Sequence, residues 1–314
     1  MKVTVVGAGN VGATCAYALA HREICEEVVL LDVKEGLAEG KALDISQNAP
    51  IGIYDTRLLG VSQDYEKTEG SQVVVITSGR PRKPGMNRDD LIHTNARIVK
   101  TVVERIREGS PEAILIIVSN PLDVMTYQAH LSSGWDRTRV IGMAGVLDAA
   151  RYKAFLAAEL NVSPKEIQTL LLGGHGDTMV PLPRYTTVGG IPIHEFLEAD
   201  RLDAIAQRTK VGGGELTKLL GTSAWYAPGG AAAQMVEAIL RNQRRIFAAC
   251  VRLEGEYGID NCYLGVPVIL GRQGVQKIIS LQLQPEEQEL LEISAEHVKD
   301  VMKARDRTEK EQGL

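Results

Sequence analysis

Residues 3–12 read VTVVGAGNVG, and this stretch decides the fold. A β-branched run, Val3–Val6, leads into a Gly-x-Gly-x-x-Gly pattern, and a helical pattern follows it near Val11–Arg22. A second apolar run ends at Asp32, 20 residues after Gly12, which is close to the spacing of an acid that binds a ribose. Glycine turns also occur for purely steric reasons. Together, however, the strand, the helix and the acid predict a dinucleotide-binding loop.

Each glycine of this loop has an expected role. We expect Gly7 to permit the tight turn, Gly9 to let the backbone approach a pyrophosphate, and Gly12 to allow close packing of helix and strand. The helix N-terminus would offer its N–H groups to the phosphates. The predicted cofactor-binding residues of the loop are Gly7, Ala8, Gly9, Asn10, Val11 and Gly12. Asp32 would accept hydrogen bonds from both ribose hydroxyls and repel a 2′-phosphate, which favours NAD over NADP.

The first half of the chain alternates short apolar strands with helical patterns. Six expected strands share this character: Val3–Val6, Glu27–Asp32, Thr56–Val61, Gln72–Thr77, Ala113–Val118 and Arg139–Gly142. Continuous apolar strands separated by helices indicate a parallel sheet that is covered on both faces. We therefore predict an α/β protein with a doubly wound parallel (Rossmann) sheet.

After about residue 145 the pattern becomes mixed α+β. Helices are expected near 146–160, 231–240 and 285–308, strands near 167–172, 264–270 and 275–281, and a hairpin at 186–193. We predict two tightly packed domains, residues 1–143 for the dinucleotide and residues 144–314 for the substrate.

Composition excludes several classes of protein. The chain has 314 residues, of which 44% are hydrophobic and 24% charged, as in ordinary globular proteins. A net charge of −5 with only 4% aromatic residues argues against nucleic-acid binding. No apolar run is long enough to cross a membrane, and the chain begins in a strand-like run without a signal segment. Its four cysteines form no Cys-x-x-Cys pair, so we expect neither a disulfide scaffold nor a metal site, and a cytoplasmic protein.

Three segments carry candidate chemistry. His175 stands between glycines in residues 172–178, LGGHGDT, where a sharp turn can bring an imidazole to a reacting centre. Asp148 and Arg151 share one face of an expected helix, a spacing that an ordinary ion pair within the helix also explains. Residues 77–90, after the fourth strand, hold four basic residues with proline and glycine, and they predict a lid over the ligand crevice. The alternative for this segment is a solvated basic loop.

In this order and at these intervals, the motifs resemble the lactate/malate dehydrogenase family, and more closely the malate dehydrogenases of its lactate-dehydrogenase-like group. The resemblance covers nearly the whole chain and includes residues 221–226, GTSAWY. It implies that His175 exchanges a proton with the substrate while Asp148 orients its imidazole. The substrate-binding residues that it implies are Arg82, Arg88, Asn120, Arg151 and Ser223, and the further cofactor contacts are Asn95, Val118 and Asn120.

Arg82 bears on the choice of substrate. Lactate dehydrogenases of the family typically carry a neutral glutamine there, whereas the malate enzymes carry arginine. Oxaloacetate has a second carboxylate for this guanidinium, and pyruvate has only a methyl group. The expected reaction is therefore the NAD-dependent, reversible oxidation of (S)-malate to oxaloacetate, a step of the tricarboxylic acid cycle.

Other interpretations remain open at this point. They are a lactate dehydrogenase, a short-chain dehydrogenase, although the chain lacks its Tyr-x-x-x-Lys motif, and an NAD-binding sensor without catalysis. The resemblance also implies a homo-oligomer, which we expect to be a tetramer, with a dimer as the alternative. The resemblance implies a cis Asn120-Pro121 bond as a hypothesis, and trans is the alternative, since most X-Pro bonds are trans.

Overall fold

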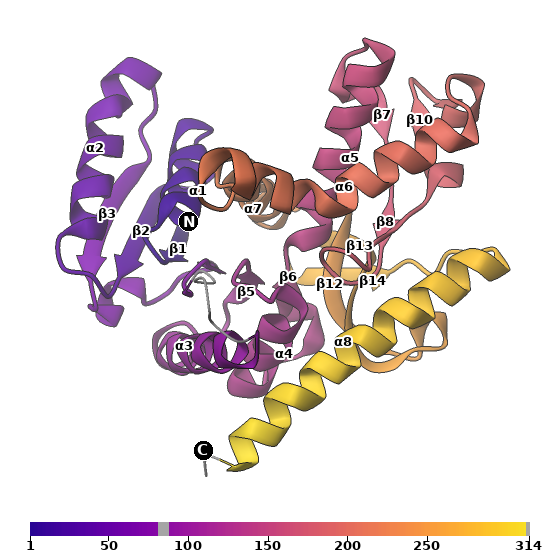
Figure 1. Cartoon of the computed structure of the whole chain (residues 1–314). Helices are drawn as coiled ribbons and strands as arrows, with labels where there is room; N and C mark the ends of the chain where they lie inside the picture. Colours follow the sequence, from indigo (N-terminus) through magenta and orange to yellow (C-terminus); the bar gives the residue numbers. More distant parts are fainter. Residues whose placement is uncertain (81–87, 312–314) are drawn as a thin grey trace.

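The computed structural model describes the backbone of residues 1–80 and 88–311, and the side chains of residues 1–80 and 91–307. A nine-stranded sheet runs through the molecule, and its six N-terminal strands are parallel in the order β6-β5-β4-β1-β2-β3 (Figure 1). These strands are β1 (Lys2–Val6), β2 (Glu27–Asp32), β3 (Arg57–Ser62), β4 (Val73–Ile76), β5 (Ile114–Ile117) and β6 (Val140–Gly142).

Helices cover both faces of this parallel sheet. They are α1 (Asn10–His21), α2 (Leu37–Gly52), α3 (Arg88–Gly109) and α4 (Leu122–Ser133). Helices α3 and α4 pack together on one side of the strands, and α1 lies on the other side with α7 (Tyr226–Leu240) (Figure 1). All four residues of β4 and all four of β5 are buried, because a parallel strand between two helical layers has no solvent-facing side. The predicted doubly wound α/β fold is confirmed.

The direction of winding changes between β1 and β4. From β1 the chain proceeds outward to β2 and β3, and from β4 it proceeds the other way to β5 and β6. In a doubly wound sheet, ligands bind at this switch point, beyond the carboxyl ends of the strands. The loops after β1, β4 and β5 therefore face one crevice.

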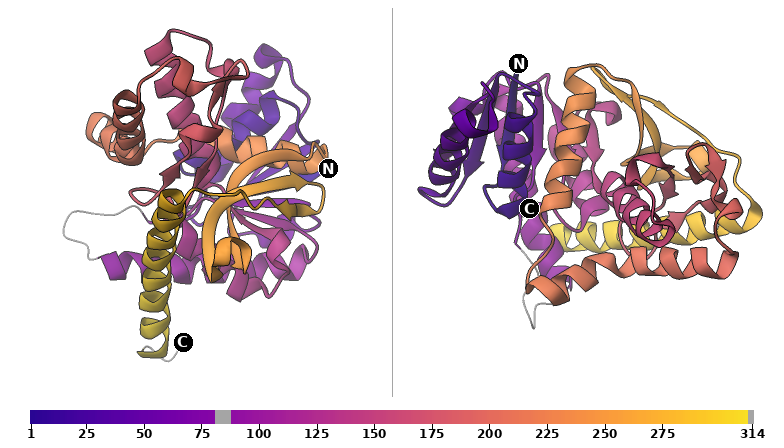
Figure 2. Two further views of the ribbon diagram at one scale, coloured as in Figure 1. Left: turned by 90° about the vertical axis from the view of Figure 1, so that its right-hand side faces the viewer. Right: turned by 90° about the horizontal axis from the view of Figure 1, so that it is seen from above.

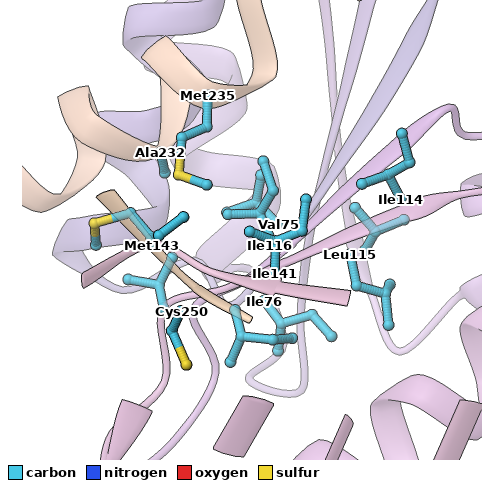
Figure 3. Close-up of a cluster of buried hydrophobic side chains, with 14 of the residues drawn as sticks. Val75, Ile76, Ile114, Leu115, Ile116, Ile141, Met143, Ala232, Met235 and Cys250 are labelled. Carbon is cyan, nitrogen blue, oxygen red and sulfur yellow. The ribbon is translucent and has the colours of Figure 1, made fainter. Parts of the chain in front are cut away.

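The same sheet continues into the C-terminal half. Three antiparallel strands, β12 (Arg245–Glu254), β13 (Asp260–Gly271) and β14 (Gly274–Ile278), join it where Cys250 of β12 pairs with Gly142 of β6. The sequence analysis places strands over most of β13 and β14 but misses β12. One hydrophobic core consequently spans both halves of the chain, and Figure 3 shows Ile116 and Ile141 beside Ala232, Met235 and Cys250.

The remaining helices and strands form the outer part of the C-terminal half. The helices are α5 (Ala144–Leu160), α6 (Ala199–Leu220) and α8 (Pro285–Glu311). Two small sheets hold β7 (Ile167–Gln168), β10 (Thr187–Val188) and β11 (Ile191–Pro192), and β8 (Leu171–Leu172) with β9 (Val180–Pro181). Short 3-10 turns lie at Tyr65–Thr68, Arg137–Arg139, Pro164–Glu166, Pro183–Tyr185, Ile193–Glu195 and Glu256–Gly258.

In this half, the predicted hairpin is present and one predicted strand is wrong. The hairpin at 186–193 is present as β10 and β11, with positive φ at Gly189 and Gly190. The single strand predicted at 167–172 is wrong, because β7 pairs with β10 in one sheet while β8 pairs with β9 in another. The chain changes sheets at residues 169–170. Helix α8 then returns across the molecule to pack against α3 and α4 (Figures 1 and 2).

Helices α1 and α7 pack against each other across the two halves of the chain. Gly229 of α7 lies against α1, and a Cβ at this position would be 2.7 Å from Thr14 Cβ and 2.9 Å from the Cys15 nitrogen. Nearby, the buried Glu237 carboxylate pairs with Arg22, the C-cap residue of α1, and with Arg241. Because α1 begins at the glycine loop, this contact also positions that loop.

Two adjacent glycines of α7 provide a matched test. We expect Gly229→Ala to destabilise the protein by about 1–3 kcal/mol, because the added methyl group forces α1 and α7 apart. Gly230→Ala meets no atom within 4 Å. It should instead be neutral or stabilising by up to about 1 kcal/mol, because alanine is the better helix former. Urea denaturation of both variants measures the difference, and equal unfolding midpoints would contradict the packing argument.

Candidate active site

The loop after β1 is fixed by its first and last glycines. Gly7 has a φ of +104°, and a Cβ there would be 2.7 Å from Thr77 Oγ1 and 2.8 Å from the Ser78 nitrogen. A Cβ at Gly12 would come within 1.8 Å of the Gly7 carbonyl oxygen. Both positions therefore exclude a side chain, and the N-terminal turn of α1 packs directly onto the end of β1.

Gly9 differs, because a Cβ there would meet no atom within 4 Å. It is the exposed N-cap residue of α1, and no side chain caps this helix end. The N–H groups of the first turn consequently face open space, where the helix dipole favours a negative charge. Asn10 is exposed and Val11 half-buried beside it, whereas Ala8 is fully buried. This cradle of backbone N–H groups fits a pyrophosphate.

Asp32 ends β2 next to the same loop. Its Oδ2 accepts the N–H of Ala8 at 2.6 Å, and its Oδ1 accepts the N–H of Lys34 at 2.9 Å. These bonds fix the carboxylate at the edge of the crevice, where its remaining lone pairs can accept ribose hydroxyls. The loop and the acid together fit a dinucleotide without a 2′-phosphate.

The loops after β4 and β5 are joined by Asn95 of α3. The Asn95 side chain is buried, its Oδ1 accepts the N–H of Arg80 at 2.8 Å, and its Nδ2 donates to the carbonyls of Arg80 and Asn120 at 3.2 and 2.7 Å. The Asn95 amide thus holds backbone. Asn120 is exposed and precedes a cis bond to Pro121, and Val118 is buried at the end of β5.

His175 and Asp148, predicted as a pair, are in contact. The Nδ1 of His175 lies 2.9 Å from Asp148 Oδ2, and Asp148 on α5 is almost fully buried. Arg151, one turn further along α5, approaches the other carboxylate oxygen at 3.4 Å. The carboxylate therefore contacts the imidazole and the guanidinium at the same time.

The loop that carries His175 is anchored on three elements. Gly173 forms a β-bridge with Gly265 of β13, with N···O distances of 2.9 and 3.0 Å. The N–H of Gly174 donates to Ser294 Oγ of α8 at 2.8 Å, and the N–H of His175 donates to Asp123 Oδ2 of α4 at 3.0 Å. The sequence analysis missed both Ser294 and Asp123. Asp123 follows Asn120 by three residues and is the one charged residue in an apolar first turn, which is the signal that could have identified it.

The electrostatics around His175 favour its charged form. Burial, the largest single effect, would lower the pKa of His175, and the Asp148 carboxylate opposes it through its charge and its hydrogen bond. Asp123 acts in the same direction and Arg151 against it, so that the pKa is raised above its ordinary value. An imidazole in this setting can hold a proton at neutral pH and still release it.

A hollow of about 480 Å³ opens beside the imidazole. It is lined by Asn120, Asp123, His175 and Asp177, and by His297 of α8. On the far side of Asp148, Arg151 Nε is buried and has no hydrogen-bond partner among the described residues. A second hollow of about 500 Å³ lies between α4, β13 and α8, and none of the described residues that line it is a predicted site residue.

The sequence analysis predicts three further substrate-binding residues, Arg82, Arg88 and Ser223. Ser223 is exposed in the segment between α6 and α7. Arg82 lies outside the described residues, and Arg88 begins α3 but its side chain is not described. Among the described residues there is no group of three or more His, Cys, Asp or Glu side chains that could hold a metal, and no helix long and apolar enough to span a membrane.

A doubly wound sheet with an open glycine loop, an acid at the end of β2 and a buried His–Asp pair is typical of NAD-dependent oxidoreductases. The NAD-binding domain model of the lactate/malate dehydrogenases matches residues 1–142, and the α/β C-terminal domain model of the same enzymes matches residues 145–308. The chain belongs to the lactate/malate dehydrogenase family. It is an NAD-dependent oxidoreductase, as the sequence predicts, and NAD is its cofactor.

Individual relatives agree over nearly the whole chain. A malate dehydrogenase of Cytophaga hutchinsonii is 68% identical over 306 residues, which cover 98% of each chain. The solved malate dehydrogenase of Salinibacter ruber is 50% identical, covers 100% of both chains and superimposes with a TM-score of 0.95. A lactate dehydrogenase of Cryptosporidium parvum, solved with lactic acid and nicotinamide adenine dinucleotide, is 36% identical over 97% of this chain and 98% of its own, with a TM-score of 0.93. The fold therefore does not distinguish the two activities.

Substitutions at two glycines of the loop distinguish an effect on cofactor binding from an effect on folding. We expect Gly9→Ala to leave the unfolding midpoint unchanged and to raise the Kd of NADH about tenfold or more, the equivalent of losing one charge-assisted hydrogen bond of ~1.5–3 kcal/mol. Gly12→Ala should instead lower the yield of folded protein, because its methyl group collides with the Gly7 carbonyl. Fluorescence titration with NADH and thermal unfolding test both. Unchanged NADH affinity in Gly9→Ala would contradict the assignment of the cradle.

Proposed function

We propose that this protein catalyses the NAD-dependent, reversible oxidation of (S)-malate to oxaloacetate, with His175 as the acid–base residue and Asp148 as its partner. The observation that carries the proposal is the buried Asp148 carboxylate, which contacts the His175 imidazole at 2.9 Å and the Arg151 guanidinium at 3.4 Å. The His175 imidazole can exchange a proton with a substrate. The Arg151 guanidinium beside it can bind a carboxylate of the same substrate. The malate dehydrogenases among its relatives support the choice of substrate.

Asp148 determines which imidazole nitrogen reacts. A carboxylate beside Nδ1 keeps a proton on that nitrogen, which leaves Nε2 to exchange a proton with the substrate. In malate oxidation the neutral Nε2 accepts the hydroxyl proton, and Asp148 stabilises the imidazolium that results. In oxaloacetate reduction the imidazolium returns this proton to the carbonyl oxygen. When bound, NAD supplies the acceptor or donor of the hydride.

Arg151 provides the anchor for the C1 carboxylate. Its side chain is 14% exposed, and its Nε has no partner among the described residues, so that donors remain for a ligand. A guanidinium presents two parallel N–H groups that match a carboxylate, and burial strengthens this pairing. Binding at Arg151 would hold C2 of the substrate near the imidazole.

The remaining contacts complete the proposed site. Asn120 and Ser223 would bind the substrate, and Arg88 would polarise the C2 carbonyl, where negative charge develops in the transition state. Arg82 would pair with the second carboxylate. Gly7–Gly12, Asp32, Asn95, Val118 and Asn120 would contact the cofactor. We propose two domains, residues 1–143 and 144–314, and the family models over residues 1–142 and 145–308 support this division.

We also propose that the protein is a cytoplasmic homotetramer, with a dimer as the alternative, and that it acts in the tricarboxylic acid cycle. Exposed apolar side chains support association of copies. Those on or just after α2 and on α6 and α7 are between 48% and 85% exposed: Leu43, Ile51, Ile53, Val211, Leu219, Leu220 and Tyr226. The four cysteines are buried and unbridged, which agrees with a reducing compartment.

Substrate selectivity tests the role of Arg82. We expect oxaloacetate to be preferred to pyruvate by about a hundredfold to several thousandfold in kcat/KM, because pyruvate would leave a desolvated guanidinium unpaired at a cost of ~3–5 kcal/mol. Arg82→Gln should lower this preference by a large part of that factor. NADH oxidation with both substrates, on the wild type and the variant, measures it. Equal preference in the two proteins would show that Arg82 does not contact the substrate.

A further inference from the structure

A second carboxylate lies next to the catalytic loop. Asp123 occupies the first turn of α4, just after the Asn120-Pro121 bond, and it is 8% exposed. Its Oδ2 accepts the backbone N–H of His175 at 3.0 Å, a contact between residues 52 positions apart. Asp123 and Asn120 line the same hollow as His175. One carboxyl group thus connects the loop after β5 with the loop that carries the acid–base residue.

The contact leaves little room for movement of the loop backbone. A Cβ at Gly174 would lie 3.3 Å from Asp123 Oδ2 and 2.9 Å from Val298 Cγ2. The loop is therefore held between α4 and α8, and any shift of the His175 backbone toward α4 would bring it against this carboxyl. The Gly174 N–H bond to Ser294 fixes the opposite side.

Few other groups around Asp123 can stabilise a buried negative charge. Among the described residues Oδ1 has no hydrogen-bond partner, and the groups that face the carboxyl are the Cys250 thiol of β12, the His175 loop and, further off, Asp148 of α5. Burial raises the pKa of the Asp123 carboxyl, and the N–H of His175, its imidazole and the Cys250 thiol reduce that rise without cancelling it. A carboxyl group in such a place costs stability unless a nearby positive charge compensates it. Within these surroundings, the imidazolium of His175 is the group that can do so.

We propose that Asp123 is a positioning residue for His175: its carboxylate holds the backbone of the catalytic loop, and its charge stabilises the imidazolium that delivers the proton to the substrate. Asp148 acts on the ring nitrogen, whereas Asp123 acts on the same residue from the backbone side. The inference deepens the proposed function and rests on it in so far as His175 is the proton donor.

The two roles of Asp123 can be separated by substitution. In Asp123→Asn the amide oxygen can accept the same N–H, but the charge is lost. In Asp123→Ala both the acceptor and the charge are lost, and the buried N–H of His175 has no partner from this side chain. The amide variant therefore isolates the electrostatic role, and its comparison with the alanine variant isolates the role of the hydrogen bond.

The first experiment titrates His175 directly, without turnover. Protein with ¹³C-labelled histidine is titrated by NMR in the wild type and in Asp123→Asn, and the resonance absent from His175→Asn identifies residue 175. We expect the pKa of His175 to fall by about half to one unit in Asp123→Asn, because a nearby negative charge is removed. Glu237→Gln is the matched control, since Glu237 is an equally buried carboxylate on α7 that pairs with Arg22 and Arg241. It should leave the titration of His175 unchanged.

The second experiment measures oxaloacetate reduction against pH. Reduction needs the imidazolium, so its kcat/KM is full below the pKa of His175 and is lost as the pH rises through it. In Asp123→Asn this loss should begin about half to one pH unit lower, with kcat on the acid side within about threefold of the wild type. Asp123→Ala should reduce kcat about tenfold or more at every pH, because the loop loses its acceptor.

An unchanged pKa of His175 in Asp123→Asn would overturn the electrostatic role. Equal kcat in the alanine and asparagine variants would overturn the role of the hydrogen bond. If the amide variant does not fold, Asp123→Ser gives the same comparison with a smaller neutral side chain. Wild-type protein that fails to reduce oxaloacetate would refute the proposed function alone, because the NMR titration does not depend on the substrate.

Discussion

The structure depends on one buried carboxylate. Asp148 is 2% exposed, and it contacts a histidine and an arginine that the chain brings from a loop and from the next turn of the same helix. A carboxylate removed from water is unfavourable unless charged or hydrogen-bonded partners surround it. The need to satisfy Asp148 therefore ties the position of the His175 loop to helix α5. The contact with Asp148 raises the pKa of the His175 imidazole and directs Nδ1 toward the carboxylate.

The nine-stranded sheet determines where Asp148 and His175 lie relative to each other. Helix α5 follows β6 directly, and β12 joins the sheet at that strand, so that β13 lies two strands from the start of α5. The bridge between Gly173 and Gly265 then anchors the His175 loop to β13. The parallel strands meanwhile direct the glycine loop, Asp32 and Asn120 to the switch point of the sheet. A continuous core connects the glycine-loop half with the half that carries the His175–Asp148 pair (Figure 3).

The sequence predicts those features that depend on local patterns. The glycine loop, Asp32 and the parallel strands follow from spacing and from alternation within short segments, and the structure contains them. The His175–Asp148 pair came from a resemblance, because 27 residues separate the two and local pattern alone allows an ordinary ion pair for Asp148 and Arg151. Asp123 and Ser294 were missed, since their roles consist of contacts with backbone far away in the sequence.

Helix α6 and strand β12 are among the elements that the sequence analysis misses. Helix α6 contains three consecutive glycines, Gly212–Gly214, which are poor helix formers. The sequence pattern therefore does not predict this helix of 22 residues. Tertiary packing overrides this propensity, since Leu202 and Ile205 of α6 are buried in the core beside α5. Strand β12 was missed although residues 246–251, IFAACV, form the kind of continuous apolar run that indicates a strand.

The most direct test of the account is the effect of Asp148→Asn on proton transfer. The amide keeps the size of the side chain but removes the charge, and it can donate to Nδ1 and so favour the wrong imidazole tautomer. We expect the rate of oxaloacetate reduction to fall by about 10²–10⁴-fold, while the Kd of NADH stays within about twofold of the wild type. Single-turnover kinetics with saturating NADH measures this step. A variant that reduces oxaloacetate within about threefold of the wild-type rate would show that the buried carboxylate does not control His175.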